Sequence, residues 1–87
     1  MSAPHFTLYV KPGCGWCDDA TGWLDEHGYT YDEIDVNSDA AAFAQMRRIS
    51  GQTKCPTIVA GDEMLPDFDT GQLKGFLREH GWLSTAA

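Results

Sequence analysis

The stretch that decides the fold is residues 6–17, FTLYVKPGCGWC, in which a short apolar run meets Pro12-Gly13 and then a Cys-x-x-Cys pair. The run Phe6–Val10 is short and rich in aromatic and β-branched residues, which favours a buried strand over a helix. Over residues 16–27, apolar side chains recur every three or four positions, and Gly28 supplies a typical C-terminal stop. The sequence therefore predicts a strand, a tight turn and a helix that begins at the cysteines.

A second strand and a second helix are predicted next. Residues 29–36 alternate apolar and polar side chains, with one phase slip near Asp32, and this period favours a strand. Ser38 can cap the following helix, whose apolar face repeats at helical spacing until Ser50-Gly51 ends it. A strand, a helix and a strand in so short a span imply a right-handed parallel crossover.

The last third of the chain predicts a hairpin and a helix. Residues 56–60 and 63–65 have strand character and are joined by a Gly-Asp turn. Asp69 stands three residues before Gln72, a capping-box spacing, and Gly81 closes the helix that follows. The expected order is β-α-β-α-β-β-α, an α/β protein with a four-stranded mixed sheet and helices on both faces.

Length, charge and cysteine count narrow the class of protein. The 87 residues suffice for one domain, over 1–87. Thirteen acidic against six basic residues give a net charge of -7, which argues against nucleic acid and acidic membrane surfaces as partners. No apolar run approaches the ~20 residues that span a bilayer, and residues 1–5 lack a signal-peptide pattern, so we expect a cytoplasmic protein. Three cysteines cannot pair fully, and we expect reduced thiols.

The chemistry is expected at Cys14 and Cys17, which stand at the start of the first helix and one turn further on. Free backbone N–H groups, the positive end of the helix dipole and the nearby Lys11 favour a thiolate at Cys14. Residues three apart on a helix share a face, so the two sulfurs can close a disulfide. We therefore expect Cys14 to attack a substrate disulfide and Cys17 to resolve the mixed disulfide that forms.

Two other interpretations of the cysteine pair have less support. A zinc site needs about four ligands, whereas the sequence has no second Cys-x-x-Cys, and His5, His27 and His80 are scattered singly. No metal site is therefore expected. Cysteines that merely fill a helix terminus would not need the strand-turn-helix context and the flanking lysine seen here.

Two segments together resemble the glutaredoxin family. Residues 9–17 read Tyr-Val-Lys-Pro-Gly-Cys-Gly-Trp-Cys, and residues 50–57 read Ser-Gly-Gln-Thr-Lys-Cys-Pro-Thr. They are similar to the family's aromatic-x-Lys-x-x-Cys-x-x-Cys element and to the Thr-Val-Pro element that follows it further along the chain. The resemblance covers nearly the whole sequence and implies a thioredoxin-like fold with a Cys-Gly-Trp-Cys dithiol site.

The resemblance also implies a glutathione site. It places Pro56 in a cis peptide bond beside the Cys14 sulfur, where the backbone of Cys55 can pair with the extended cysteine of glutathione. Trp16 would pack over the site. The tripeptide's carboxylates would meet side chains and the start of the last helix; the residues at these positions are Lys11, Gln52, Arg47 or Arg48, and the backbone N–H groups of Phe68, Asp69 and Thr70.

Three departures from the family pattern matter. Residues 65–69, Leu-Pro-Asp-Phe-Asp, stand where the family usually has Gly-Gly; Pro66 lacks an N–H, and the Asp67 charge opposes a ligand carboxylate. Cys55 replaces a Val or Thr, and we expect it to act as a small buried apolar residue rather than as a redox thiol. Gly15 replaces a proline, and glutaredoxins without that proline include members that hold a 2Fe-2S cluster.

The expected function is the reduction of protein or glutathione mixed disulfides by Cys14 and Cys17, with glutathione as reductant and co-substrate. Disulfide-containing proteins are the expected partners, and a monomer is expected. One alternative is a thioredoxin-like dithiol donor for a specific protein that glutathione does not recharge, which the 65–69 loop supports. The other is a 2Fe-2S carrier that uses Cys14 and glutathione, which Gly15 supports.

Overall fold

The computed structural model describes residues 3–83 and contains the predicted order of elements. The strands are β1 (Phe6–Val10), β2 (Tyr31–Asp35), β3 (Thr57–Ala60) and β4 (Glu63–Pro66). The helices are α1 (Gly15–Glu26), α2 (Ala40–Ser50) and α3 (Thr70–Glu79). None of the helices within residues 3–83 is both long enough and apolar enough to cross a membrane.

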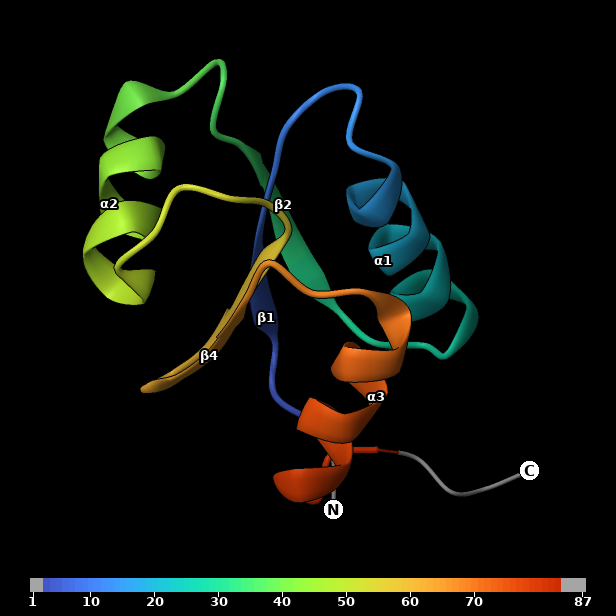
Figure 1. Cartoon of the computed structure of the whole chain (residues 1–87). Helices are drawn as coiled ribbons and strands as arrows, with labels where there is room; N and C mark the ends of the chain where they lie inside the picture. The colour runs from blue at the N-terminus through green and yellow to red at the C-terminus, as the bar shows by residue number, and fades with distance from the viewer. Residues whose placement is uncertain (1–2, 84–87) are drawn as a thin grey trace.

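The four strands form one mixed sheet in the order β2-β1-β3-β4 (Figure 1). β1 pairs with β2 in parallel, as a crossover through α1 requires, while β1 with β3 and β3 with β4 are antiparallel. Figure 1 shows α2 on one side of the sheet and α1 with α3 on the other. The predicted fold class, a thioredoxin-like four-stranded mixed sheet with helices on both faces, is confirmed.

The position of β1 explains its continuous apolar sequence. It lies inside the sheet, between β2 and β3, and helices cover both faces, so four of its five residues are buried. Phe6 and Leu8 have no exposed surface, and Leu24 of α1, Met46 of α2 and Ile58 of β3 are equally buried. A strand packed on both faces is a rigid support, and the cysteine loop follows directly from its carboxyl end.

The predicted start of the second helix was wrong by one residue. Asp39, not Ser38, is the N-cap of α2, and its Oδ1 accepts a hydrogen bond from the Ala42 N–H at 3.0 Å. The Ser38 hydroxyl instead donates to Asp35 Oδ2 at 3.0 Å, in the turn that ends β2. Both residue types are good caps, and the competing hydrogen bond to Asp35 decides between them.

The second strand is shorter than predicted, spanning Tyr31–Asp35 rather than residues 29–36. It is an edge strand, and two of its five residues are exposed. Tyr29 packs among aromatic rings ahead of the strand, and its hydroxyl donates to the Trp82 carbonyl at 2.8 Å. An apolar side chain in that aromatic cluster has the same alternating pattern in the sequence as one in a strand. The predicted start of β2 was therefore two residues too early.

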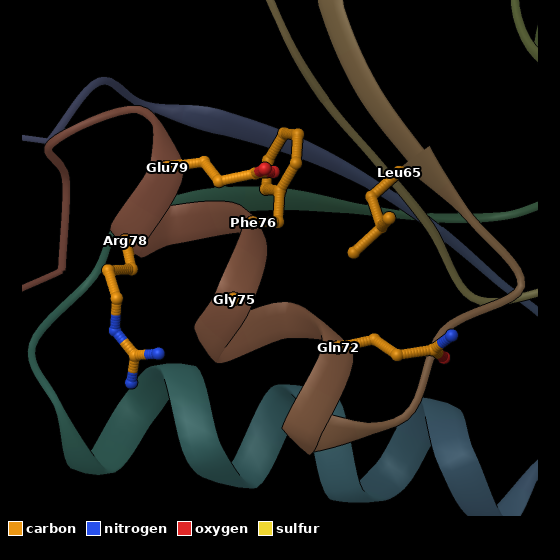
Figure 2. Close-up of a pocket in the computed structure, with 6 residues that line it drawn as sticks. All are labelled: Leu65, Gln72, Gly75, Phe76, Arg78 and Glu79. Atoms are coloured by element: carbon orange, nitrogen blue, oxygen red, sulfur yellow. The ribbon is translucent and has the colours of Figure 1, made fainter.

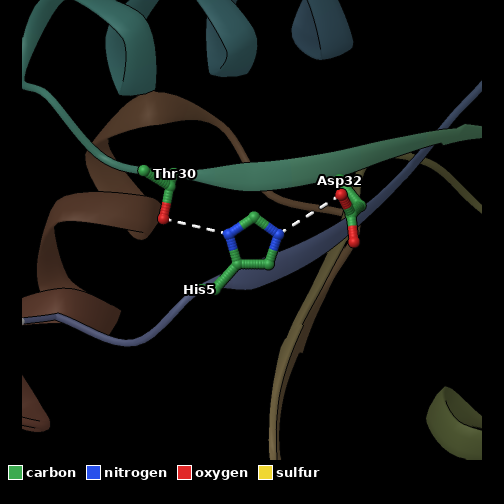
Figure 3. Close-up of polar contacts among 3 residues, drawn as sticks. All are labelled: His5, Thr30 and Asp32. Carbon is green, nitrogen blue, oxygen red and sulfur yellow. Dashed lines mark hydrogen bonds and ion pairs between the residues drawn. The ribbon is translucent and has the colours of Figure 1, made fainter.

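An exposed histidine links the beginnings of β1 and β2 (Figure 3). The His5 ring lies 3.0 Å from Thr30 Oγ1 on one side and 3.3 Å from Asp32 Oδ1 on the other. Both ionisable side chains are more than half exposed, at 53% and 73%, so this contact adds little to stability. It lies at the opposite end of β1 from the cysteines and plays no part in the site.

Candidate functional site

Cys14 is the N-cap of α1. Its backbone is extended, with φ -97° and ψ 109°, and its Sγ accepts a hydrogen bond from the Cys17 N–H at 3.1 Å. A capping side chain normally supplies an oxygen here, and the sulfur takes that place. The helix dipole and the Cys17 N–H both favour negative charge on this atom. The half-buried Cys14 side chain therefore lies where these groups favour a negative charge, and it remains partly open to a substrate.

Cys17 lies one turn further along the same helix in a very different environment. Only 3% of its surface is exposed. Burial raises the pKa of its thiol to about 12, and a hydrogen bond with the Cys14 side chain acts in the same direction. Cys17 is thus held as a neutral thiol. It lies next to the Cys14 sulfur, which is the atom that Cys17 would attack.

The segment before β3 forms the opposite wall of the site. The peptide bond between Cys55 and Pro56 is cis, which confirms what the resemblance implied. The Cys55 carbonyl oxygen lies 3.8 Å from Cys14 Sγ, close enough for the thiol to donate a weak hydrogen bond. Residues far apart in the sequence, 14 and 55, therefore meet at one point.

Gln52 stabilises this wall from behind. Its side-chain amide donates to Ser50 Oγ, the Lys54 carbonyl and Thr57 Oγ1 at 2.9, 3.2 and 3.1 Å, while its Oε1 accepts from the Lys54 N–H. These bonds join Gln52 to the last residue of α2, to the loop that carries Cys55 and Pro56, and to the first residue of β3. The predicted ligand-binding side chain is thus already engaged in holding the loop in shape.

Cys55 turns its own side chain towards the core. It is 7% exposed, and its Sγ lies 3.8 Å from the Met46 sulfur of α2. Burial raises the pKa of the Cys55 thiol, and the positive charge of Lys11 acts in the opposite direction. Its packing is that of the small buried apolar residue that the sequence predicted. The contact with Met46 was not predicted, because no local sequence pattern indicates it.

The start of α3 is capped by its own side chains. The Asp69 N–H donates to Gln72 Oε1 at 3.0 Å, and the Gln72 N–H donates to Asp69 Oδ1 at 2.8 Å, which completes the predicted capping box. One of the three backbone donors predicted for a ligand, that of Asp69, is therefore occupied. The Phe68 side chain is fully buried, so that residue can offer only its backbone.

Asp67 has a backbone conformation that usually belongs to glycine. Its φ is +48°, within the left-handed region, and its N–H donates to the Pro56 carbonyl at 2.8 Å. Asp is one of the side chains that tolerate this conformation. The loop thus holds a left-handed turn without a glycine at this position and carries a carboxylate there.

The remaining predicted residues lie around the site at different distances from its centre. Lys11 lines a hollow of about 200 Å³ together with Cys17 and the acidic residues Asp18, Glu33 and Asp35. Trp16, two residues after Cys14, is 48% exposed, and its packing over the sulfurs stays a prediction.

Two further hollows lie on the helices. Arg47 and Arg48 border one of about 380 Å³ with Phe43 and Ala44, and neither Cys14 nor Cys17 lines it. The other, of about 450 Å³, is shown in Figure 2; its lining residues come from β4 and α3, and Gln72 is the one that also belongs to the capping box. No group of three or more His, Cys, Asp or Glu side chains within residues 3–83 is placed to hold a metal ion.

The comparisons with known proteins agree with this arrangement. The glutaredoxin family model matches residues 6–65. A glutaredoxin of Neisseria meningitidis serogroup A is 36% identical over 63 residues, covering 71% of this chain and 74% of the relative.

Solved structures extend the likeness in fold. A glutaredoxin from Archaeoglobus fulgidus superposes with a TM-score of 0.74 at 20% identity, covering 84% of this chain and 85% of the other. NrdH-redoxin from Escherichia coli, a glutaredoxin-like protein with a thioredoxin-like activity profile, gives 0.70 at 23% identity over 95% and 99%. At these identities the two structures establish the fold alone.

Proposed function

The chain belongs to the glutaredoxin family, a family of thiol oxidoreductases, and on that premise we propose that it reduces protein and glutathione mixed disulfides through Cys14 and Cys17, with glutathione as its reductant. The observation that carries this proposal is the position of Cys14: its sulfur caps α1, accepts the Cys17 N–H and faces the Cys55 carbonyl. The nucleophile, the resolving thiol and a backbone edge for the substrate thus meet at one place.

The reaction follows from the contrast between the two sulfurs. The Cys14 thiolate attacks one sulfur of a substrate disulfide, forms a mixed disulfide and releases the other substrate sulfur as a thiolate. Cys17 then loses its proton, attacks the Cys14 sulfur and releases the second substrate thiol. One glutathione opens the Cys14–Cys17 disulfide at Cys14, and a second removes the first as glutathione disulfide.

Glutathione as reductant rests on the wall formed by Cys55 and Pro56. An extended peptide thiol placed at Cys14 lies alongside the backbone of residue 55, where strand-like pairing can hold it. Lys11, which is exposed on the loop ahead of Cys14, offers a positive charge for a ligand carboxylate. Phe68 and Thr70 contribute their backbone N–H groups at the start of α3.

A second candidate, a thioredoxin-like dithiol donor to one protein partner, is favoured by the start of α3. There, the Asp69 N–H is bonded to Gln72, and Asp67 adds a negative charge, so an anionic ligand finds fewer donors and more repulsion. NrdH-redoxin, a fold neighbour with a thioredoxin-like activity profile, offers a precedent for such a protein.

The two candidates are separated by the reductant. With hydroxyethyl disulfide as substrate, turnover driven by glutathione, glutathione reductase and NADPH is expected for the first. Reduction by thioredoxin reductase and NADPH, without glutathione turnover, would establish the second instead. Cys14→Ser is expected to abolish turnover, whereas Cys17→Ser keeps part of the glutathione-dependent activity, because glutathione itself can resolve the mixed disulfide. Full activity in Cys14→Ser would refute the assignment of the nucleophile.

We further propose that the protein works as a monomer in the cytoplasm. Cys14, Cys17 and Cys55 are all free thiols, which suits a reducing compartment. The proposed partners are glutathione and proteins that carry disulfides, and the exposed Trp16 offers such proteins an aromatic contact.

A further inference from the structure

We propose that Cys55 is a third redox-active thiol, which resolves a mixed disulfide on Cys14 by forming a Cys14–Cys55 disulfide when Cys17 does not. The inference rests on the proposed function in one respect, the role of Cys14 as the attacking sulfur. It extends that function by giving a chemical role to a buried thiol that the dithiol mechanism leaves unused.

The first argument is distance. Cys14 Sγ lies 3.8 Å from the Cys55 carbonyl oxygen, which by standard backbone dimensions places it within roughly 6 Å of the Cys55 Cα. A disulfide needs about 4.4 to 6.8 Å between its two Cα atoms, and the observed contact places the Cys14 sulfur, which the bond would join, beside the backbone that carries the second thiol. Cys55 is therefore not an isolated cysteine, since its backbone already contacts the reacting sulfur.

The second argument is what holds the Cys55 sulfur in place. Its Sγ packs on the Met46 sulfur at 3.8 Å, and no hydrogen bond of the described residues joins it to any other group. A weak, polarisable contact of this kind gives way more easily than a network of hydrogen bonds. The proposed step requires a rotation about the Cys55 side chain that takes the sulfur from Met46 to Cys14.

The third argument is local charge. The positive charge of Lys11 acts on the Cys55 thiol against the effect of burial, and so favours the thiolate that the reaction needs. Asp35 and Cys14 act in the same direction as burial, and the net shift of the Cys55 pKa is upward. In this scheme Cys17 remains the first thiol to resolve the mixed disulfide, and Cys55 acts only when Cys17 does not.

The proposed step balances without an outside reagent. The Cys55 thiol loses its proton to solvent, and its sulfur attacks the Cys14 sulfur of the Cys14–S–S–R mixed disulfide. The bond between Cys14 and R breaks, and R leaves as a thiolate that takes up a proton. Cys55 is oxidised and R is reduced, while Cys14 stays at the same oxidation level.

The test uses the full chain carrying Cys17→Ser. The reduced variant is mixed at low micromolar concentration with one equivalent of dithiobis(nitrobenzoate), and released thionitrobenzoate is followed by absorbance. Attack by Cys14 releases a first equivalent. Resolution by Cys55 is expected to release a second, at a rate independent of protein concentration, and peptide mapping is expected to find a bond between residues 14 and 55.

The control is Cys17→Ser combined with Cys55→Ala, which is expected to release the first equivalent and lose the second. Because Cys55→Ala disturbs the core, Cys17→Ser with Met46→Leu serves as a packing control that keeps the thiol, and it should keep the second equivalent. Loss in both double variants would attribute the release to packing and overturn the proposal.

The test separates two failures. A first equivalent without a second in Cys17→Ser would refute the role of Cys55 and leave the proposed function standing. If no first equivalent were released, the attacking role of Cys14 would fail, and the proposed function with it.

Discussion

Cys14 and Cys17 lie one helical turn apart, yet their surroundings assign them opposite tasks. The first sulfur is half-buried, accepts a hydrogen bond from a backbone N–H and faces a carbonyl. The second cysteine is buried, with only 3% of its surface exposed. The Cys-x-x-Cys spacing brings the sulfurs together, while burial decides which of them meets the substrate.

This contrast predicts selective alkylation. In the reduced native protein at pH 7.5, iodoacetamide is expected to label Cys14, while Cys17 and Cys55 stay unlabelled, because burial excludes the reagent and raises both their pKa values. A raised pKa means less thiolate at a given pH. Labelling of Cys17 should therefore rise about tenfold per pH unit and level off only near the thiol pKa of about 12. Peptide mass spectrometry measures each site.

Two controls give the alkylation result its meaning. In guanidinium chloride all three cysteines should be labelled, since unfolding removes the burial that protects two of them. In Cys14→Ser, protection of Cys17 should persist, because burial, the largest cause of its raised pKa, does not depend on Cys14. Equal labelling of Cys14 and Cys17 at pH 7.5 would contradict the assignment of their roles.

Single residues could be predicted where a motif fixes the backbone, and less well where the role depends on neighbours. The sequence placed Cys14 at the start of the helix and, through the family resemblance, Pro56 in a cis bond, and both are confirmed. The ligand-binding role of Gln52 stays a prediction; in the structure its side chain has four hydrogen bonds, to Ser50, Lys54 and Thr57. A polar side chain gives the same sequence signal whether it binds a ligand or its own loop.

At the scale of elements, α3 combines stability with control of the site. Its capping box satisfies two backbone N–H groups that would otherwise lack partners at a helix start. The same bonds take the Asp69 N–H away from an incoming anion. The residues that fix this helix are therefore the ones that weaken its start as a carboxylate site.

The cap predicts the effect of Asp69→Ala. The substitution removes the acceptor for the Gln72 N–H and the charge that favours a helix start, so the free energy of unfolding should fall by about 1 kcal/mol. Urea denaturation followed by circular dichroism measures this as a lower midpoint at an unchanged slope. Thr70→Ala is the matched control in the same turn and should cost less. An unchanged midpoint in Asp69→Ala would show that the cap contributes nothing.

The order of the helices and strands was predictable because hydrophobic periodicity and turn residues are local sequence signals. The exact ends of each element depend on which of several possible contacts forms. The β2 start was placed at residue 29 because Tyr29 is apolar and in phase, although it packs beside Phe6 and Trp82 ahead of the strand. The α2 cap was assigned to Ser38 because nothing in the local sequence shows that Asp35 would accept its hydroxyl. The first error arises from a contact with residues distant in sequence, and the second from a choice between two adjacent capping residues that a local hydrogen bond decides.

Over the whole molecule, the acidic charge bears on which disulfides reach Cys14. The net charge is -7, and Asp18, Glu33 and Asp35 line the hollow beside Cys17. Lys11 lies in the same hollow and opposes them locally. The rate at which a charged disulfide approaches depends on the field of the whole protein, whereas the binding of a carboxylate depends on the nearest positive charge. Salt screens the long-range field more strongly than the close contact, so the two effects can be measured separately.

The field predicts opposite salt effects for substrates of opposite charge. Between 0.02 and 0.2 M sodium chloride, the rate of Cys14 attack on cystamine, a dication, should fall severalfold, and the rate with glutathione disulfide, a dianion, should rise, because screening weakens attraction and repulsion alike. Hydroxyethyl disulfide, which is neutral, is the control and should change little. Stopped-flow tryptophan fluorescence of the reduced protein follows each reaction. A fall with glutathione disulfide would mean that Lys11 and its neighbours outweigh the other charges at the site, and Lys11→Gln should then abolish that fall.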